Sequence, residues 1–283
     1  MGRLGVPEPA LLRRRATLVR ALRTWLHDQG FVEIEVPVLV RSPALEEHLE
    51  ALRVGEHGYL HTSPEFALKR VLASGLPRIF SLTPCFRAEE WGPLHATEFT
   101  MLEWYRIGTD YRGILEDCEA LAGACAAALG VELPPARRAT VAELWSELVG
   151  RPMPSDSTEM LRIWVTEVEP RLLQPTFVLD YPADQSAFAV VRGAVAERFE
   201  LYWRGVELAN AFTELLDPSE LLERWTHSNE ARIAAGRSPY PIDERLIEAV
   251  GRHPRAGGIA LGVDRLAMLL LGVDDIRQLR VLG

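Results

Sequence analysis

Residues Phe86–Arg106 read FRAEEWGPLHATEFTMLEWYR, and this stretch decides the expected architecture. Together with the residues before it, it contains two β-rich segments, 79–86 and 97–105, joined by the polar loop 87–96. Aromatic and β-branched residues bounded by polar clusters are typical of strands. The stretch therefore predicts two neighbouring strands, with Arg87 at the start of their connecting loop.

A second stretch near the C-terminus, Gly257–Gly272, reads GGIALGVDRLAMLLLG. Its small residues lead into an apolar pattern with helical spacing that contains Asp264 and Arg265. Small residues let the backbone approach a ligand closely. The stretch predicts a close backbone surface followed by a helix with Arg265 near its start.

The sequence pattern of the N-terminal region predicts a helix followed by a strand. Apolar residues at helical spacing predict a helix from Leu11 to Gln29, and Gly30 is a typical helix stop. The segment 31–40 alternates apolar and acidic residues, which predicts a strand, and Pro37 confines that strand to an edge or an interface.

The remaining segments favour an α+β fold, an antiparallel β-sheet flanked by helices. Ser63-Pro64-Glu65 is a helix-start pattern of N-cap, first-turn proline and first-turn acid. The other expected elements are helices at 65–75, 111–130 and 218–236, a hairpin at 199–210 that turns near Arg204-Gly205, and short helices within 131–175.

Composition excludes several classes of protein. The chain has 283 residues, is 48% hydrophobic, and carries a formal charge of −9, which disfavours a broad nucleic-acid-binding face. Its apolar runs are too short for a membrane span, and no secretory signal begins the sequence. Three cysteines without paired spacing fit a reducing compartment. We expect a cytoplasmic protein that does not bind membranes.

Three ordered segments carry a resemblance to a known family. The helix–strand pair at 11–40, the stretch at 86–106 and the stretch at 257–272 resemble motifs 1, 2 and 3 of class II aminoacyl-tRNA synthetases. TSPEFALKR (Thr62–Arg70) and ELANAFTEL (Glu207–Leu215) are similar to the lysyl branch, and within it to the truncated paralogues that attach a lysyl group to elongation factor P. The resemblance implies a class II catalytic fold over 1–283, in which we expect no anticodon-binding domain.

The implied reaction is adenylation, in which a carboxylate attacks the α-phosphate of ATP. The carboxylate is already ionised at neutral pH, so the site must supply cations and alignment rather than a general base. The resemblance assigns catalysis to Arg87 and Arg265, adenine stacking to Phe99 against Arg265, and the adenine edge to Glu89. The ATP-binding set that it implies is Arg87, Glu89, Phe99, Glu207, Leu208, Gly262 and Arg265. A single arginine in a polar loop is usually only solvated, but the ordered combination favours the functional interpretation.

Two groups of acidic residues complete the expected site. Glu200 and Glu207 come roughly opposite each other across the predicted hairpin, where like charges are unfavourable without a cation between them. In the lysyl family the matching pair holds Mg²⁺ on the triphosphate; two acids on a solvated strand face are the simpler alternative. The resemblance implies that lysine or β-lysine is bound by Ser63, Pro64, Glu65, Glu103, Tyr105, Asn210, Glu214 and Ala260.

Three functions fit these patterns. The chain modifies a lysine of elongation factor P, or it charges tRNA with a catalytic domain alone, or it is an inactive regulatory paralogue. Acidic net charge makes tRNA an unlikely partner, and the retained arginines and acids disfavour an inactive protein. Ser63 and Ala260 stand where lysyl-tRNA synthetases usually have Ala and Gly, which predicts a preference for β-lysine.

Two expectations concern protein contacts. The 11–40 segment resembles the class II dimer element, which predicts a homodimer. A local basic patch around the 87–96 loop, with Arg87 and Arg106, is expected to receive elongation factor P.

Overall fold

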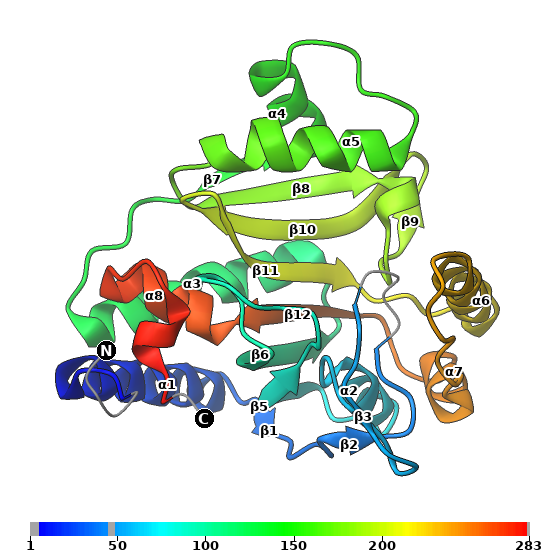
Figure 1. The fold of residues 1–283 in the computed structure, drawn as a ribbon, viewed down its shortest axis with the longest axis horizontal. Coiled ribbons are helices and arrows are strands. Elements are labelled where there is room, and N and C mark those ends of the chain that lie inside the picture. The colour runs from blue at the N-terminus through cyan, green and yellow to red at the C-terminus, as the bar shows by residue number, and fades with distance from the viewer. Residues whose placement is uncertain (1–5, 45–48, 282–283) are drawn as a thin grey trace.

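The computed structural model describes residues 6–44 and 49–281 of the chain. One nine-stranded sheet runs through it in the order β1-β5-β6-β12-β11-β10-β8-β7, with β9 paired to β10 (Figure 1). The outer pairs β1/β5 and β7/β8 are parallel and every other pair is antiparallel. The strands are β1 Val32–Glu33, β5 Arg78–Phe86, β6 Glu98–Ile107, β7 Arg137–Thr140, β8 Thr176–Pro182, β9 Val191–Arg192, β10 Val195–Trp203, β11 Val206–Thr213 and β12 Ala256–Gly262. The predicted α+β class, with an antiparallel sheet flanked by helices, is confirmed.

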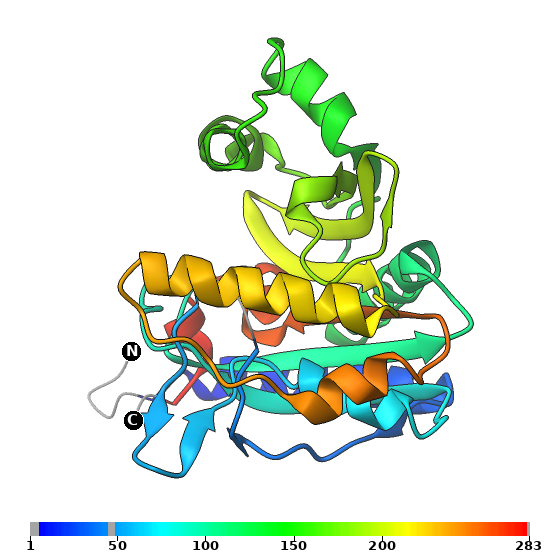
Figure 2. The ribbon, with the colours of Figure 1, turned by 90° about the vertical axis from the view of Figure 1, so that its right-hand side faces the viewer.

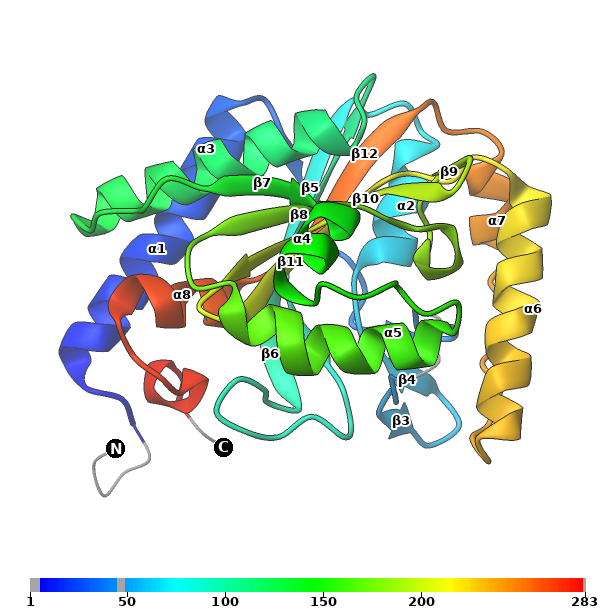
Figure 3. The ribbon, with the colours of Figure 1, turned by 90° about the horizontal axis from the view of Figure 1, so that it is seen from above.

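Helices flank this sheet, and their bounds agree closely with the expected ones. Figure 3 shows α1, α3 and α8 on one side of the sheet and α2, α6 and α7 on the other. The helices are α1 Pro9–Asp28, α2 Glu65–Leu72, α3 Tyr111–Leu129, α4 Val141–Leu148, α5 Ser157–Ile163, α6 Pro218–Ala234, α7 Glu244–Val250 and α8 Val263–Leu271. Shorter helical turns are η1 Trp164–Val168, η2 Glu169–Arg171, η3 Ala183–Gln185 and η4 Ile276–Leu279.

The α1 helix forms because its apolar residues recur every four positions. Leu18, Leu22 and Leu26 are fully buried in the core shared with α3 and α8. Gly30 ends the helix region with a positive φ of 77°, a conformation that glycine adopts without a steric penalty. The predicted N-terminal helix is confirmed.

The predicted strand at 31–40 is wrong as a continuous element. Only Val32–Glu33 pairs with the large sheet, at its edge, and Leu39–Val40 forms β2 of a separate three-stranded sheet. The partners of β2 in that sheet are β4 Gly58–Leu60 and β3 Arg53–Val54. Pro37 lies between the two paired segments and lacks the N–H that a ladder requires, which accounts for the interruption.

Side chains alternate along the strands between a face of the sheet that is buried under helices and a face that lines a cavity. Leu102 and Trp104 of β6 point into the core with Ile259 of β12, beneath α1, α3 and α8. Their neighbours along the strands, Glu103 and Ala260, line a cavity on the opposite face. Since side chains alternate with a period of two, the apolar positions of these strands fix which polar residues face that cavity.

The segment between α3 and β8 packs against the far part of the sheet. In Figure 2 it stands above the remainder of the chain, with α4 and α5 covering β8 and β10. Its core is built from residues such as Trp145, Trp164 and Tyr181. The short helices expected within 131–175 are confirmed, and α5 continues directly into the π-helical turn η1.

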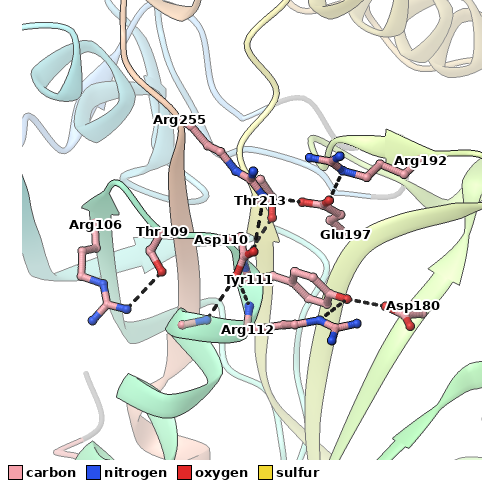
Figure 4. Close-up of polar contacts among 11 residues, drawn as sticks. Arg106, Thr109, Asp110, Tyr111, Arg112, Asp180, Arg192, Glu197, Thr213 and Arg255 are labelled. Atoms are coloured by element: carbon pink, nitrogen blue, oxygen red, sulfur yellow. Dashed lines mark hydrogen bonds and ion pairs between the residues drawn. The ribbon is translucent and has the colours of Figure 1, made fainter.

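Figure 4 shows the end of β6 and β12 that lies away from the 87–96 loop. The Tyr111 N–H donates to Thr213 at 3.1 Å, and the Tyr111 hydroxyl donates to Asp180 at 2.6 Å. Arg106 donates to Thr109 here and forms an ion pair with Asp117 at 2.8 Å. The expected patch of Arg87 with Arg106 is therefore wrong, because Arg87 follows β5 at the opposite end of these strands.

Within the described ranges 6–44 and 49–281, no helix is long and apolar enough to cross a membrane.

Candidate active site

A cavity of about 820 Å³ opens on the sheet face opposite α1, α3 and α8. The register of the strands places one row of residues across its floor. Glu103 of β6 is paired with Ala260 of β12, Ala260 with Asn210 of β11, and Asn210 with Glu200 of β10. All four line the cavity. Residues far apart in the sequence are thus brought together by strand pairing alone.

Arg87, Phe99 and Arg265 gather at the end of the cavity nearest the 87–96 loop. Gly262 is paired with Met101 at this end, so Arg265 follows directly from the strand edge into α8. The Arg87 guanidinium carbon lies 5.0 Å from the centre of the Phe99 ring, and Arg87 also pairs with Glu90 at 3.2 Å. This end presents two cations and an aromatic face, which suits a polyanionic ligand with a planar ring.

Arg265 is held in place by acceptors that do not neutralise its charge. It donates to the carbonyl oxygens of Leu94 and Glu207, at 3.2 and 2.9 Å, and lies 2.7 Å from a ring nitrogen of His95. Burial and the nearby Arg265 charge lower the pKa of His95, which keeps its imidazole neutral and able to accept. A positioned guanidinium that forms no direct ion pair with the described residues is a suitable partner for phosphate oxygens.

The loop places Glu90, rather than Glu89, on the cavity wall. Glu89 forms an ion pair with Arg237 at 3.0 Å, and its side chain is 63% exposed. Glu90 lines the cavity through its contact with Arg87. Reading the adenine edge would require Glu89 to leave Arg237.

Glu200 and Glu207 both line the cavity, but they are not directly opposite each other. Glu200 is paired with Asn210 and Glu207 with Tyr202, and the register shifts between them. Leu208 is the extra residue in β11, a β-bulge that brings Glu207 onto the same face as Glu200. The two acids were expected to come roughly opposite each other; they share one face but pair with different residues, two positions apart along β10. The predicted turn at Arg204-Gly205 is confirmed by positive φ angles of 53° and 71°.

This pair of carboxylates fits a divalent cation. Burial, and after it the nearby Glu200 charge, raise the pKa of Glu207 to about 7, as expected for like charges buried without a metal. Glu200 accepts from Tyr181 at 2.6 Å and Tyr202 at 2.5 Å, and pairs with Arg198. Groups of three or more metal-ligating side chains are absent from the part of the chain that the structure describes. Two carboxylates with phosphate and water ligands are a common Mg²⁺ arrangement.

The opposite end of the cavity holds a buried carboxylic acid. Glu103 is 1% exposed, and it accepts hydrogen bonds from Ser63 at 2.5 Å and Tyr105 at 3.0 Å. Burial, followed by the nearby Glu65 charge, raises the pKa of Glu103 to about 8. An ammonium group entering this end would favour the ionised form and gain a buried ion pair.

Lys69 lies behind this end, between two acids. Its ammonium is 2.6 Å from Glu65 on the same helix and 2.7 Å from Glu214. Burial lowers the pKa of Lys69, but Glu214 and Glu65 outweigh burial and the net shift is upward. Glu214 is almost fully buried, and burial raises its pKa to about 7 in spite of Lys69. Glu65 lines the cavity, whereas Glu214 lies beneath Gly258.

The small residues of β12 serve different purposes. A β-carbon at Gly258 would come within 2.2 Å of Glu214 and 2.3 Å of Tyr105, so this glycine makes room for the acidic end. A β-carbon at Gly257 would meet Ile114 at 2.5 Å, so that residue allows α3 to pack closely instead of admitting a ligand. A β-carbon at Gly262 would make only ordinary contacts at the arginine end, 3.7 Å from the Arg265 side chain and 3.7 Å from the Leu208 carbonyl oxygen.

With this geometry established, comparison with known proteins identifies the family. The sequence profile of the tRNA synthetases class II (D, K and N) matches residues 8–282. The chain belongs to this class II synthetase family.

Relatives within the family share most of the chain. The elongation factor P–(R)-β-lysine ligase of Vibrio cholerae is 36% identical, covering 94% of this chain and 92% of its own length. The ligases of the same name from Proteus mirabilis and Vibrio parahaemolyticus are 37% and 35% identical, each with 94% of this chain and 93% of their own length covered.

This class II synthetase site also contains residues that sequence reasoning missed. Ser157, Leu161 and Trp164 line the cavity from the segment 131–175, for which the sequence predicted short helices but no site residue. Arg198 stands two positions before Glu200 on the same strand face, a spacing that could have revealed it. Pro64, included in the expected substrate set, is not among the lining residues, because it precedes α2 and shapes its start.

Proposed function

We propose that this protein activates (R)-β-lysine, or lysine, with ATP and Mg²⁺ and transfers the lysyl group to a lysine side chain of elongation factor P in the cytoplasm. The observation that carries the proposal is the row of Glu103, Ala260, Asn210 and Glu200 across four strands. The row carries the acidic end, which is suited to ammonium groups, and lies in the same cavity as the arginine end, which is suited to phosphates.

The first step joins the amino acid to the nucleotide. A carboxylate oxygen of the amino acid forms a bond to the α-phosphorus, and the bond to the β-phosphate oxygen breaks, which releases pyrophosphate. Arg87 holds the α-phosphate and the carboxylate, and Arg265 binds the γ-phosphate. Adenine stacks on Phe99 against Arg265, with Leu208 and Gly262 beneath the nucleotide. Glu89 would reach the adenine edge once it leaves its ion pair with Arg237.

The carboxylates Glu200 and Glu207 would hold Mg²⁺ against the triphosphate. The ion would neutralise phosphate charge and align the pyrophosphate leaving group. In its absence Arg198 and two tyrosine hydroxyls satisfy Glu200. The buried Glu207, with its raised pKa, gains the most from a nearby cation.

The acidic end recognises the two amino groups of the substrate. Glu103, with Tyr105 beside it, would bind the side-chain ammonium from the cavity wall, with Glu214 beneath Gly258 as the second acid, and Glu65 would face the other amine. Asn210 lies next to Ala260 in the row, where its amide can donate to the substrate carboxylate. A site built around charged donors rejects analogues that lack them.

Ser63 and Ala260 support β-lysine over α-lysine. The Ser63 hydroxyl donates to Glu103 and accepts from the Glu65 N–H at 3.0 Å, so its remaining lone pair is available to a displaced amine. The methyl group of Ala260 narrows the floor between Glu103 and Asn210. The relatives' name, which specifies the (R)-β isomer, agrees with this preference.

The second step is assigned to elongation factor P because the relatives that match over almost their whole length carry that acceptor in their names. The acceptor amine attacks the carbonyl carbon of the adenylate, AMP leaves, and the amine loses a proton. The decisive experiment incubates the enzyme, ATP and labelled β-lysine with elongation factor P and tRNA together. Label should enter the protein, and label found only in tRNA would overturn the assignment.

We also propose that residues 1–283 form a single class II catalytic domain, which acts as a homodimer through α1 and the segment after it. A groove of about 930 Å³ runs along α1 and is lined by Arg15, Arg20 and Arg23, among others. Val32 and Leu39, in the segment that follows α1, are each 45% exposed. Equilibrium sedimentation at micromolar concentration should give twice the chain mass; a stable monomer would contradict this.

A further inference from the structure

Lys69 has no part in the roles assigned above, although it contacts two of the proposed substrate ligands. It is the only lysine in the sequence and is 4% exposed. Its ammonium reaches Glu65 at 2.6 Å and Glu214 at 2.7 Å and lies 4.8 Å from the ring centre of Phe188. A buried lysine in this setting needs an explanation, because burying an ammonium group is costly without close anionic partners.

Geometry rules out a simple helix-surface pair. Glu65 and Lys69 are four residues apart on α2, a spacing that would give an ordinary surface ion pair if exposed. Here both are buried, and the second partner, Glu214, comes from the chain just after β11. Lys69 therefore forms ion pairs both with Glu65 on the cavity wall and with Glu214 beneath Gly258.

Burial keeps Glu103 and Glu214 partly protonated without a ligand, and ionising all three acids of this end needs more positive charge than Lys69 supplies. Glu65, Glu103 and Glu214 supply up to three negative charges, and Lys69 supplies one positive charge. Glu214 keeps Oε1 without a hydrogen-bond partner among the described residues, facing the space that Gly258 leaves open. Neutralising all three ionised acids therefore takes two positive charges besides that of Lys69. Lysine and β-lysine each carry two ammonium groups.

We propose that Lys69 is a specificity-determining positioning residue, which spaces Glu65 and Glu214 and fixes the charge of the pocket for an amino acid with two ammonium groups. This inference rests on the proposed function, since it concerns the substrate of the same site. It extends that function by naming the internal cation, Lys69, which neutralises one of the three acids and leaves two for the substrate's ammonium groups. Lys69 touches no reacting atom and acts through the carboxylates.

The test measures pyrophosphate exchange with lysine, with 6-aminohexanoate, which lacks the backbone amine, and with norleucine, which lacks the side-chain amine. Wild-type enzyme is compared with Lys69→Met, which removes the charge, and Lys69→Arg, which retains it. Arg252→Met, an exposed arginine paired with Glu248 away from the cavity, is the control.

In Lys69→Met we expect the KM for lysine to rise at least tenfold and the preference for lysine over 6-aminohexanoate to fall at least tenfold. The KM for ATP should stay within twofold, which a general loss of structure would not allow. Lys69→Arg should keep its preference for two ammonium groups, even with a higher KM. This variant provides the test if Lys69→Met does not fold.

Two results would overturn the inference. One is an unchanged preference in a folded Lys69→Met enzyme, and the other is a parallel rise in KM for ATP and lysine. Failure of wild-type enzyme to exchange with either lysine isomer is a different outcome, because it removes the proposed function itself.

Discussion

The two ends of the cavity handle charge in opposite ways. At the arginine end, Arg265 is held by backbone carbonyls and a neutral histidine, so its positive charge stays available. At the acidic end, the charges lie deeper, and Lys69 satisfies part of the acid from within the protein. The arginine end suits a large, strongly charged ligand that brings its own cation. The acidic end suits a small ligand that is recognised by the number of its positive charges.

Breaking the arginine end should have the largest effect. We expect Arg265→Ala to reduce pyrophosphate exchange by roughly 10²–10³-fold or more, the range seen when one preorganised donor is removed. Arg255→Ala, which removes an exposed arginine outside the cavity, is the matched control. Circular dichroism should show both variants folded. Exchange near the wild-type rate in Arg265→Ala would contradict the assignment of the ATP site.

The metal pair gives the next largest effect. In Glu207→Gln the Mg²⁺ concentration for half-maximal exchange should rise by about 10–100-fold, the usual scale for a lost interaction at a metal site. Without Mg²⁺ the variant should melt at a higher temperature than wild type at pH 8, because a buried carboxylate near Glu200 has been removed. A Mg²⁺ titration and a melting curve check the two parts separately.

The pH dependence of folding stability tests the role of Glu103 at the acidic end. Its folded pKa of about 8 lies above the ordinary value of 4.5, so the folded enzyme binds a proton that the unfolded chain has released. Ligand-free stability should therefore fall as pH rises from about 4.5 to 8. Glu103→Gln should flatten that fall and raise the KM for lysine by about tenfold, as the loss of one hydrogen-bonded charge pair would. Melting temperatures at pH 5, 6.5 and 8 provide the measurement.

The smallest predicted effect concerns the preference for β-lysine over α-lysine. Ala260→Gly should move the ratio of kcat/KM for β-lysine to that for α-lysine toward α-lysine by about tenfold, since one methyl group in a pocket is worth roughly 1–3 kcal/mol. Ser63→Ala should act in the same direction. A wild-type enzyme that already prefers α-lysine would show that these two positions do not set the preference.

Much of the fold could be predicted because local patterns determined it. Leu18, Leu22 and Leu26 recur at helical spacing, and the turn at Arg204-Gly205 contains a glycine, which adopts a positive φ without steric penalty. The strand predicted at 31–40 failed because alternation alone does not show whether a partner strand is available on either side of Pro37.

The candidate site was predictable where strand pairing followed a regular register, and less so elsewhere. Glu103 and Asn210 fall into one row, as uninterrupted pairing requires. The bulge at Leu208 could not be foreseen, because an extra residue leaves no mark in the hydrophobic pattern. Lys69 was visible as a single lysine, but its second partner, Glu214, is 145 positions away, and only the tertiary fold brings them together.

The burial of Lys69 has one more consequence, for the chemistry of a reactive intermediate. Lysyl adenylates acylate amines, and the sequence contains no other lysine. Lys69 itself is ion-paired and covered, and the arginines that supply the remaining basic charge stay protonated and do not act as nucleophiles. An enzyme with this composition offers no lysine side chain of its own for self-acylation. The acceptor protein therefore meets an activated group for which the enzyme's own side chains do not compete.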